Sequence, residues 1–241
     1  MSRYVVRPFP PTVEADPRVG ALRDYWLARV QQHTDDSYAG VRLSKFPEDL
    51  RVYEHLLWHD APDTVIELGT QAGGSALWFR DRLHALARYR RITRTPTVIS
   101  VDIAQDWARE ELARADPDYA AGIVLLQGDV RDPATADVVR RHVADDARCF
   151  VIEDSAHEYD TTKAALSHFA GFVPPGGFFV VEDGCVDVDE MRLTDDWPRG
   201  VLPALHDWLA TTAGQQFSVR RDLELYGVSC HPEGFLQRLR R

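Results

Sequence analysis

Two pairs of acidic residues, Glu153-Asp154 and Glu182-Asp183, follow apolar runs that predict buried strands. Carboxylates gathered at neighbouring strand ends repel one another and resist joint ionisation unless a cation neutralises them. A hard divalent ion with oxygen ligands meets that need, and Mg²⁺ suits a site that also holds substrate oxygens. The alternative is a set of capping and solvated acids, but clustered ionisable groups in a crevice favour the metal site.

The choice among these acids depends on strand geometry. Side chains alternate along a strand, so Glu153 and Asp154 point to opposite sides. Asp154 is expected at the mouth of the crevice formed by the strand ends, whereas Glu153 is interpreted as an acid that packs behind it. Glu182 and Asp183 lie where the chain leaves its strand, so both can turn inward. We therefore predict Asp154, Glu182 and Asp183 as the metal ligands.

His157 lies three residues beyond Asp154. An imidazole titrates near neutral pH, so beside a metal-bound hydroxyl it can act as a general base. The alternative role is capping of the helix that follows. We favour the catalytic role for His157, with Asp154 as its catalytic partner at the metal.

A glycine-rich loop, ELGTQAGGS from Glu67 to Ser75, joins a predicted strand to a predicted helix. Glycine lets the backbone turn tightly and approach a ligand, and the helix N-terminus offers unpaired N–H groups. The spacing matches neither the dinucleotide fingerprint nor the P-loop, which also requires a lysine for the phosphates. The acidic residue before the first glycine suits a cationic ligand, and an ordinary strand-to-helix turn is the alternative.

The next two predicted strands also end in aspartates. Asp102 follows the run VISV and is placed to accept the hydroxyls of a ribose, as acids do on nucleotide-binding sheets. Asp129 follows the third strand and could lie beside an adenine ring, although Gly-Asp is also a common turn pair. A helix cap is the alternative for Asp102.

These residues require a parallel sheet to position them. Apolar runs that do not alternate with polar residues predict strands buried on both faces and covered by helices. The predicted strands are 64–68, 98–101, 123–127, 149–152 and 178–181, and the predicted helices between and after them are 75–87, 106–115, 133–144, 160–172 and 201–212. Residues 216–220 and 226–230 predict a closing hairpin. Before the sheet, the sequence predicts an extended arm over 1–16 and helices over 21–32 and from Pro47.

The composition narrows the function classes. The 241 residues carry 28 Lys+Arg against 38 Asp+Glu, a formal net charge of −10. This balance disfavours nucleic acid and anionic membranes, which reward clustered cations. No apolar run approaches the ~20 residues of a membrane span, and no secretory signal is visible. Three distant cysteines form neither a disulfide framework nor a zinc pattern, so we expect a cytoplasmic protein.

The loop 67–75, Asp102, the segment EDSAHEY from Glu153 and the run VVED ending at Asp183 resemble class I S-adenosylmethionine-dependent methyltransferases. The likeness is strongest to the cephalosporin hydroxylase / rhamnosyl O-methyltransferase family of antibiotic biosynthesis. KFPEDL, from Lys45, also resembles that family's segment before the core. The resemblance extends over roughly residues 38–236, judged by motif order.

The resemblance implies an α/β fold: a Rossmann-like, doubly wound, mostly parallel seven-stranded sheet with a C-terminal antiparallel hairpin. Residues 1–62 would form an arm and helices that act as a substrate cap or oligomer interface, and 63–241 the methyltransferase domain. Mg²⁺ would be held by Asp154, Glu182 and Asp183. S-adenosylmethionine would be bound by Glu67, Gly69, Gly73, Ser75, Asp102 and Asp129.

The implied reaction is in-line methyl transfer to a hydroxyl, with Mg²⁺ on the acceptor oxygen and His157 as base. His157 falls where catechol O-methyltransferase carries a lysine base. A sugar hydroxyl of an antibiotic or its precursor is the first expected acceptor, and we expect a homo-oligomer. The rival functions are a nicotinamide-dependent oxidoreductase on the same sheet and a non-catalytic cofactor-binding partner protein.

Overall fold

The computed structural model describes residues 22–240, and within them a seven-stranded sheet forms the centre. The strand order is β5-β4-β3-β6-β7-β9-β8. The first five strands in this order are parallel, whereas β9 pairs antiparallel with both β7 and β8. The strands are β3 (Thr64–Leu68), β4 (Thr97–Asp102), β5 (Ile123–Gln127), β6 (Cys149–Glu153), β7 (Phe178–Val181), β8 (Phe217–Val219) and β9 (Phe235–Arg238). The predicted fold class is confirmed.

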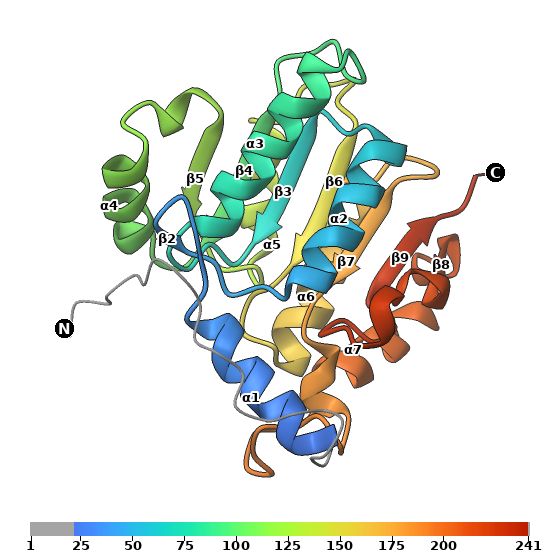
Figure 1. Ribbon diagram of the computed structural model, residues 1–241. Coiled ribbons are helices and arrows are strands. Elements are labelled where there is room, and N and C mark those ends of the chain that lie inside the picture. The colour runs from blue at the N-terminus through green and yellow to red at the C-terminus, as the bar shows by residue number, and fades with distance from the viewer. Residues whose placement is uncertain (1–21, 241) are drawn as a thin grey trace.

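Helices cover both faces of this sheet (Figure 1). One face carries α2 (Pro47–Asp60), α3 (Gly74–Arg88) and α4 (Asp106–Ala115), and the other carries α5 (Pro133–Arg140), α6 (Tyr159–Phe169) and α7 (Val201–Leu209). Short 3₁₀ turns occupy Tyr119–Ala121, Ala170–Phe172, Gly184–Asp187, Gly214–Gln216, Arg221–Leu223 and Leu225–Gly227. The helices after β5 and β7 are shorter than predicted, ending at Arg140 and Leu209.

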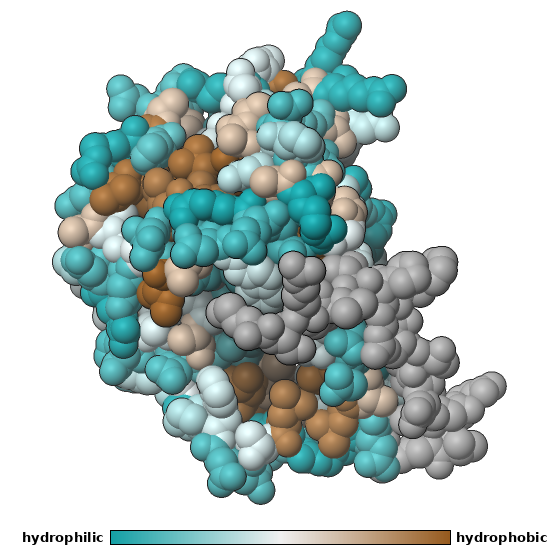
Figure 2. Space-filling model, turned by 90° about the vertical axis from the view of Figure 1, so that its left-hand side faces the viewer, coloured by the Kyte–Doolittle hydropathy of each residue, from teal (hydrophilic) through white to brown (hydrophobic). Residues whose placement is uncertain are grey.

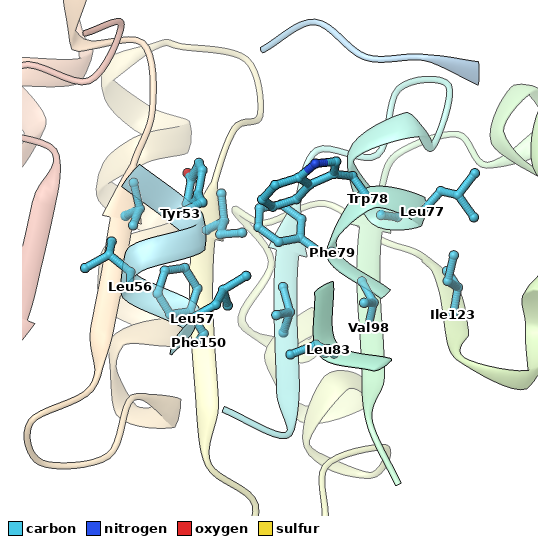
Figure 3. Packing of buried hydrophobic residues seen from close by; sticks show 14 of the residues in the cluster. Tyr53, Leu56, Leu57, Leu77, Trp78, Phe79, Leu83, Val98, Ile123 and Phe150 are labelled. Atoms are coloured by element: carbon cyan, nitrogen blue, oxygen red, sulfur yellow. The ribbon is translucent and has the colours of Figure 1, made fainter. Parts of the chain in front are cut away.

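Packing on both faces explains the continuous apolar runs. Every residue of β3 and of β6 is buried, as expected for parallel strands between two helical layers. On one face, side chains from α2 and α3 pack together over the strands, as Leu57, Phe79 and Phe150 show in Figure 3. The phenolic oxygen of Tyr53 lies at the edge of this apolar cluster and is used by the site described below.

The predicted second hairpin strand is wrong. Residues 226–230 are not a strand, and β9 (Phe235–Arg238) pairs with β8 instead. Tyr226 has a left-handed backbone, with φ of 67°, and Gly227 follows with φ of 82°. Such residues turn the chain rather than extend it. The backbone N–H of Cys230 then donates to the buried carboxylate of Asp49, 3.0 Å away, in place of a strand partner.

The first described helix, α1 (Leu22–Thr34), lies beyond the carboxyl ends of the parallel strands, near the segment after β7 (Figure 1). The indole N–H of Trp26 donates to the carbonyl of Met191 at 2.6 Å, and Arg23 donates to the carbonyls of Asp189, Glu190 and Arg192. A short hairpin of two-residue strands, β1 (Ser37–Tyr38) and β2 (Val41–Arg42), lies between the helices that the sequence predicts over 21–32 and from Pro47. The predicted arm over 1–16 lies outside the described residues.

The described surface is mixed in character. On the face shown in Figure 2, hydrophobic residues form separate areas divided by hydrophilic ones. Trp26, on α1, is only 4% exposed because it packs within the chain, whereas Trp58, on α2, is 44% exposed. Among the described helices, none combines the length and apolarity that a bilayer crossing requires.

Candidate active site

A cavity of about 970 Å³ opens at the carboxyl ends of the parallel strands. Pockets for small ligands measure about 300–1,000 Å³, so this one has room for a nucleoside cofactor and part of a second molecule. One end is formed by the loops after β3, β4 and β5, and the other by α1 and the segment after β7. Between the two ends lie Asp154, His157 and Asp183.

Gly69 brings the loop after β3 against the end of β6. Its φ is 107°, and a Cβ at this position would lie 1.9 Å from the carbonyl oxygen of Asp154. Only glycine permits both the conformation and the approach. The N–H of Asp154 donates to the carbonyl of Leu68 at 2.8 Å, which joins the two strand ends. The loop after β3 is therefore joined directly to the strand end that carries Asp154.

Asp102 and Asp129 line the same end of the cavity. One oxygen of Asp102 accepts from the backbone N–H groups of Thr70 (2.9 Å) and Gln71 (3.1 Å). Asp102 thus orders the loop after β3, and its carboxylate has lone pairs left for a ligand. Asp129 is paired with Arg131, which holds the pKa of Asp129 below its ordinary value.

Two of the predicted cofactor-binding residues do not line the cavity. Ser75 and Gly69 do, but Glu67 is fully buried beneath the loop and Gly73 faces the side chain of Leu112. Glu67 accepts from the hydroxyl of Ser100 at 2.5 Å, and its other oxygen has no hydrogen-bond partner in the described structure. Because Glu67 is the fourth residue of a strand buried on both faces, it points into the protein. The structure therefore places both residues behind the wall of the cavity, and their cofactor-binding role stays a prediction.

Burial raises the pKa of Glu67 to about 7, although Lys45 opposes the rise. An acid whose folded pKa exceeds its unfolded value destabilises the fold as pH rises between the two. We therefore expect the stability gained by Glu67→Gln, relative to wild type, to grow between pH 5 and pH 8, reaching a few kcal/mol. Urea unfolding at the two pH values measures this difference. If Glu67→Gln gained the same unfolding free energy at both pH values, the pKa of Glu67 would be an ordinary one.

Lys45 lies at the centre of the acidic cluster. Its ammonium group is 2.8 Å from Oδ2 of Asp154 and 2.7 Å from both carboxylate oxygens of Glu182. The hydroxyl of Tyr53 donates to the same Glu182 at 2.5 Å. Burial alone would lower the pKa of Lys45, but Asp154 and Glu182 outweigh it and raise that pKa. The lysine therefore stays charged and offsets one of the two carboxylates.

His157 faces Asp183 across the mouth of the site. Its Nε2 is 3.3 Å from Oδ2 of Asp183 and 3.9 Å from Oδ1 of Asp154. Both His157 and Asp183 have left-handed backbones, with φ of 55° and 56°, and such strain in non-glycine residues gathers at functional sites. Burial would lower the pKa of His157, but the carboxylates of Asp183 and Asp154 outweigh it and raise that pKa.

The donor set fits a hard divalent cation. Ligand atoms of Asp154, His157 and Asp183 lie within 4.8 Å of one another, and Asp183 forms a second such group with Glu182 and His231. Carboxylate oxygens are the ligands that Mg²⁺ prefers. Lys45 takes one oxygen of Asp154 and faces both of Glu182, and each carboxylate keeps further lone pairs. The three predicted ligands thus share one region, with Asp183 common to both groups.

Three residues of the cavity or of the acidic cluster were not predicted from the sequence. Lys45 was noted only as part of a resembling segment. His33, on α1, lines the cavity with a buried Nδ1 that has no partner in the described structure, and burial lowers its pKa. His231 is buried, and its Nδ1 accepts from the N–H of Asp183 at 3.2 Å. Nothing in the sequence near His33 or His231 indicated a role in the site, because each reaches it through contacts between segments that are far apart in the sequence.

Comparison with known proteins shows which family this chain resembles and which solved structures share its fold. The family model described as rhamnosyl O-methyltransferase/CmcI matches residues 30–239. Rhamnosyl O-methyltransferase of Mycobacterium tuberculosis is 28% identical over 155 residues, which cover 64% of this chain and 59% of the relative. The protein of the same name from Mycobacterium leprae is 28% identical over 148 residues, covering 61% and 59%. The matches thus span less than two thirds of these relatives.

Solved structures share the fold. CmcI in a complex with Mg and SAM superposes with a TM-score of 0.62 at 23% identity, covering 96% of this chain and 90% of that one. An O-methyltransferase from Bacillus cereus in complex with SAH gives a TM-score of 0.57 at 14% identity, covering 81% and 82%. These likenesses support the arrangement of the sheet and helices described above.

Proposed function

Because the chain belongs to the rhamnosyl O-methyltransferase/CmcI family, we propose that it methylates a hydroxyl of a small natural product, using S-adenosylmethionine and Mg²⁺. The observation that carries this proposal is the single cavity that joins the Asp102 loop to the group of Asp154, His157 and Asp183. A methyl donor at one end and a hydroxyl acceptor at the other would meet at that group.

The cofactor end of the cavity suits a sulfonium nucleoside. Gly69 lets the backbone approach the ligand, Ser75 and Asp129 line the wall, and Asp102 has oxygens for ribose hydroxyls. The methyl donor supplies a carbon already activated by its sulfonium charge. The chain's contribution is to hold the acceptor oxygen in line with that carbon, which avoids the entropic cost of bringing two molecules together.

The metal end suits a hydroxyl that must lose a proton. Bound at Asp154, Asp183 and Glu182, Mg²⁺ would act as a Lewis acid toward the acceptor oxygen. Lys45 and Tyr53 hold Glu182 in place, and Lys45 also holds Asp154. His157, directed at the same group by its contact with Asp183, receives the proton of the acceptor at Nε2.

The acceptor pocket is assigned to α1 and the segment 185–199. Trp26 and Val30 from α1 and Met191, Leu193 and Trp197 from the segment line that end of the cavity. This supports a substrate-cap role for the described part of residues 1–62. The curated relatives are named for a rhamnosyl acceptor, so a sugar hydroxyl is our first choice and an antibiotic intermediate the second. A homo-oligomer and a cytoplasmic location stay predictions.

A screen of hydroxylated sugars and natural products with labelled methyl donor, with Mg²⁺ or with a chelator, tests the proposal. Asp154→Asn should keep the fold and bind the methyl donor while losing metal-dependent turnover, by about 10²-fold or more. Asp145→Asn, at an exposed position, is the matched control and should behave as wild type. Turnover that survives the chelator would remove the metal from the mechanism.

The rival functions make different predictions in a binding experiment. A nicotinamide oxidoreductase should bind NAD(H), whereas we expect calorimetry to show binding of S-adenosylmethionine and none of NAD(H). The loop from Glu67 to Ser75 has no G-x-G-x-x-G spacing for a pyrophosphate. A non-catalytic partner protein should bind the methyl donor, yet methylate nothing with any acceptor or metal.

A further inference from the structure

Two of the three cysteines meet at the wall of the cavity. Cys185 lies in the 3₁₀ turn directly after Asp183, and Cys230 lies in the loop before β9. Both line the cavity, and both are nearly buried, at 8% and 5% exposure. No sequence motif contains this pair, because its members lie 45 positions apart. The antiparallel pairing of β7 with β9 brings the two segments together.

The local backbone holds the two thiols at fixed positions. The N–H of Cys185 donates to the carbonyl of Cys230 at 3.1 Å, and the N–H of Cys230 donates to Asp49 at 3.0 Å. The thiol sulfurs of both cysteines and a carboxylate oxygen of Asp183 lie within 4.8 Å of one another. Three donor atoms on two anchored segments therefore converge on one small region of the cavity wall.

We propose that Cys185, Cys230 and Asp183 form a binding site for a thiophilic divalent cation of the Zn²⁺ class. Sulfur ligands select such ions and are avoided by Mg²⁺, which takes oxygen ligands. Around a tetrahedral ion with metal–sulfur bonds of about 2.3 Å, neighbouring ligands are roughly 3.8 Å apart. Small movements of the three side chains from their present spacing, which is at most 4.8 Å, would bring their ligand atoms to that distance. All three residues also line the cavity, through which an ion can reach them.

Asp183 links this thiol site to the proposed reaction centre. The same carboxylate belongs to the group with Asp154 and His157. A cation held by the two thiols therefore draws Asp183 away from the group that our proposed function assigns to Mg²⁺. The two thiols also pack with Trp26, Val30 and Phe46. An ion bound by the thiols would therefore also disturb the packing of α1, which lines the proposed acceptor pocket. The thiol site is an inhibitory one for the proposed reaction.

Cadmium is a suitable probe, because cadmium–thiolate bonds absorb in the ultraviolet. We expect the reduced, metal-free full chain to bind one equivalent of Cd²⁺ with that absorption. Cys185→Ser and Cys230→Ser should each remove most of it and weaken binding at least tenfold, whereas Cys149→Ser, a buried free cysteine in β6, should leave both unchanged. Absence of the band in wild type, or its survival in both of the first two variants, overturns the site.

X-ray absorption of the Zn²⁺-loaded wild-type chain gives a test that needs no variant. We expect two sulfur neighbours at about 2.3 Å, and a shell of oxygen and nitrogen alone overturns the site. Neither measurement uses a methyl donor or acceptor. The thiol site can therefore stand if methyl transfer is never found, and methyl transfer can stand if this site fails. Only the inhibition by Zn²⁺ requires both.

Discussion

Replacing Lys45 by methionine is expected to destabilise the protein by about 3–5 kcal/mol, the usual cost of removing one partner of a buried ion pair. The ammonium group lies within 2.8 Å of Asp154 and 2.7 Å of Glu182, and it is almost wholly buried. Without it, two carboxylates face each other, and the hydroxyl of Tyr53 still donates to Glu182. Methionine fills a similar volume, so the loss reports charge rather than packing.

The pH dependence of this loss follows from the same contacts. The folded pKa of Lys45 lies above its unfolded value. Its stabilising contribution is therefore complete below the unfolded pKa of about 10.4 and is lost only at more alkaline pH. Burial and the charge of Glu182 already raise the pKa of Asp154, so in the variant the Asp154 carboxyl can take up a proton and the deficit should shrink as pH falls toward 5. Mg²⁺ should stabilise the variant more than wild type, because a dication can replace the missing charge.

Lys163 provides the control, since it is the other lysine of the chain. Its side chain is 43% exposed and lies 3.7 Å from Asp207. Surface pairs of this kind contribute about 0–1 kcal/mol, so Lys163→Met should change the unfolding free energy little. Denaturant unfolding followed by circular dichroism compares the two variants. If both variants lost the same unfolding free energy, the buried ion pairs of Lys45 would contribute no more to stability than a surface pair.

The strand-end acids were predictable because their positions follow from the chain direction alone. A parallel sheet brings every strand's carboxyl end to one edge, so Asp102, Asp154 and Asp183 had to meet there once the strands were identified. The strand and helix segments themselves were predicted from apolar runs and helical spacing. Chain direction does not give the side-chain direction at a buried position, and Glu67 consequently turned out to point into the protein rather than toward the cavity.

The partners of these acids were not predictable from one sequence. Lys45 precedes the sheet by about twenty residues and reaches Glu182 only because α2 packs on the strands. The thiols of Cys185 and Cys230 meet through the pairing of β9 with β7, and that strand was predicted at the wrong residues. Contacts of this kind depend on tertiary packing, which local periodicity and spacing do not encode.

Replacing His157 by glutamine is expected to lower the turnover number of the proposed methyl transfer by about 10²–10⁴-fold, the usual contribution of a general base. Glutamine keeps a polar group near Asp183 and cannot take up a proton at neutral pH. Affinity for the methyl donor should change little, because Gly69 and Asp102 form the other end of the cavity. The effect should therefore fall on turnover rather than on binding.

The pH–rate profile separates this role from a structural one. The nearby carboxylates raise the pKa of His157 above its ordinary value, and a base works only when unprotonated. Bound Mg²⁺ neutralises the same carboxylates and so opposes this rise in pKa. Wild-type turnover should therefore rise with pH as the imidazole of His157 loses its proton, and this limb should be missing in His157→Gln. His206→Gln, which alters a surface contact with Glu233, is the matched control and should keep the limb. If the turnover number of His157→Gln is within a few-fold of wild type and its acid limb is intact, another group is the general base. His33 would then be the next histidine to test, because it lines the same cavity.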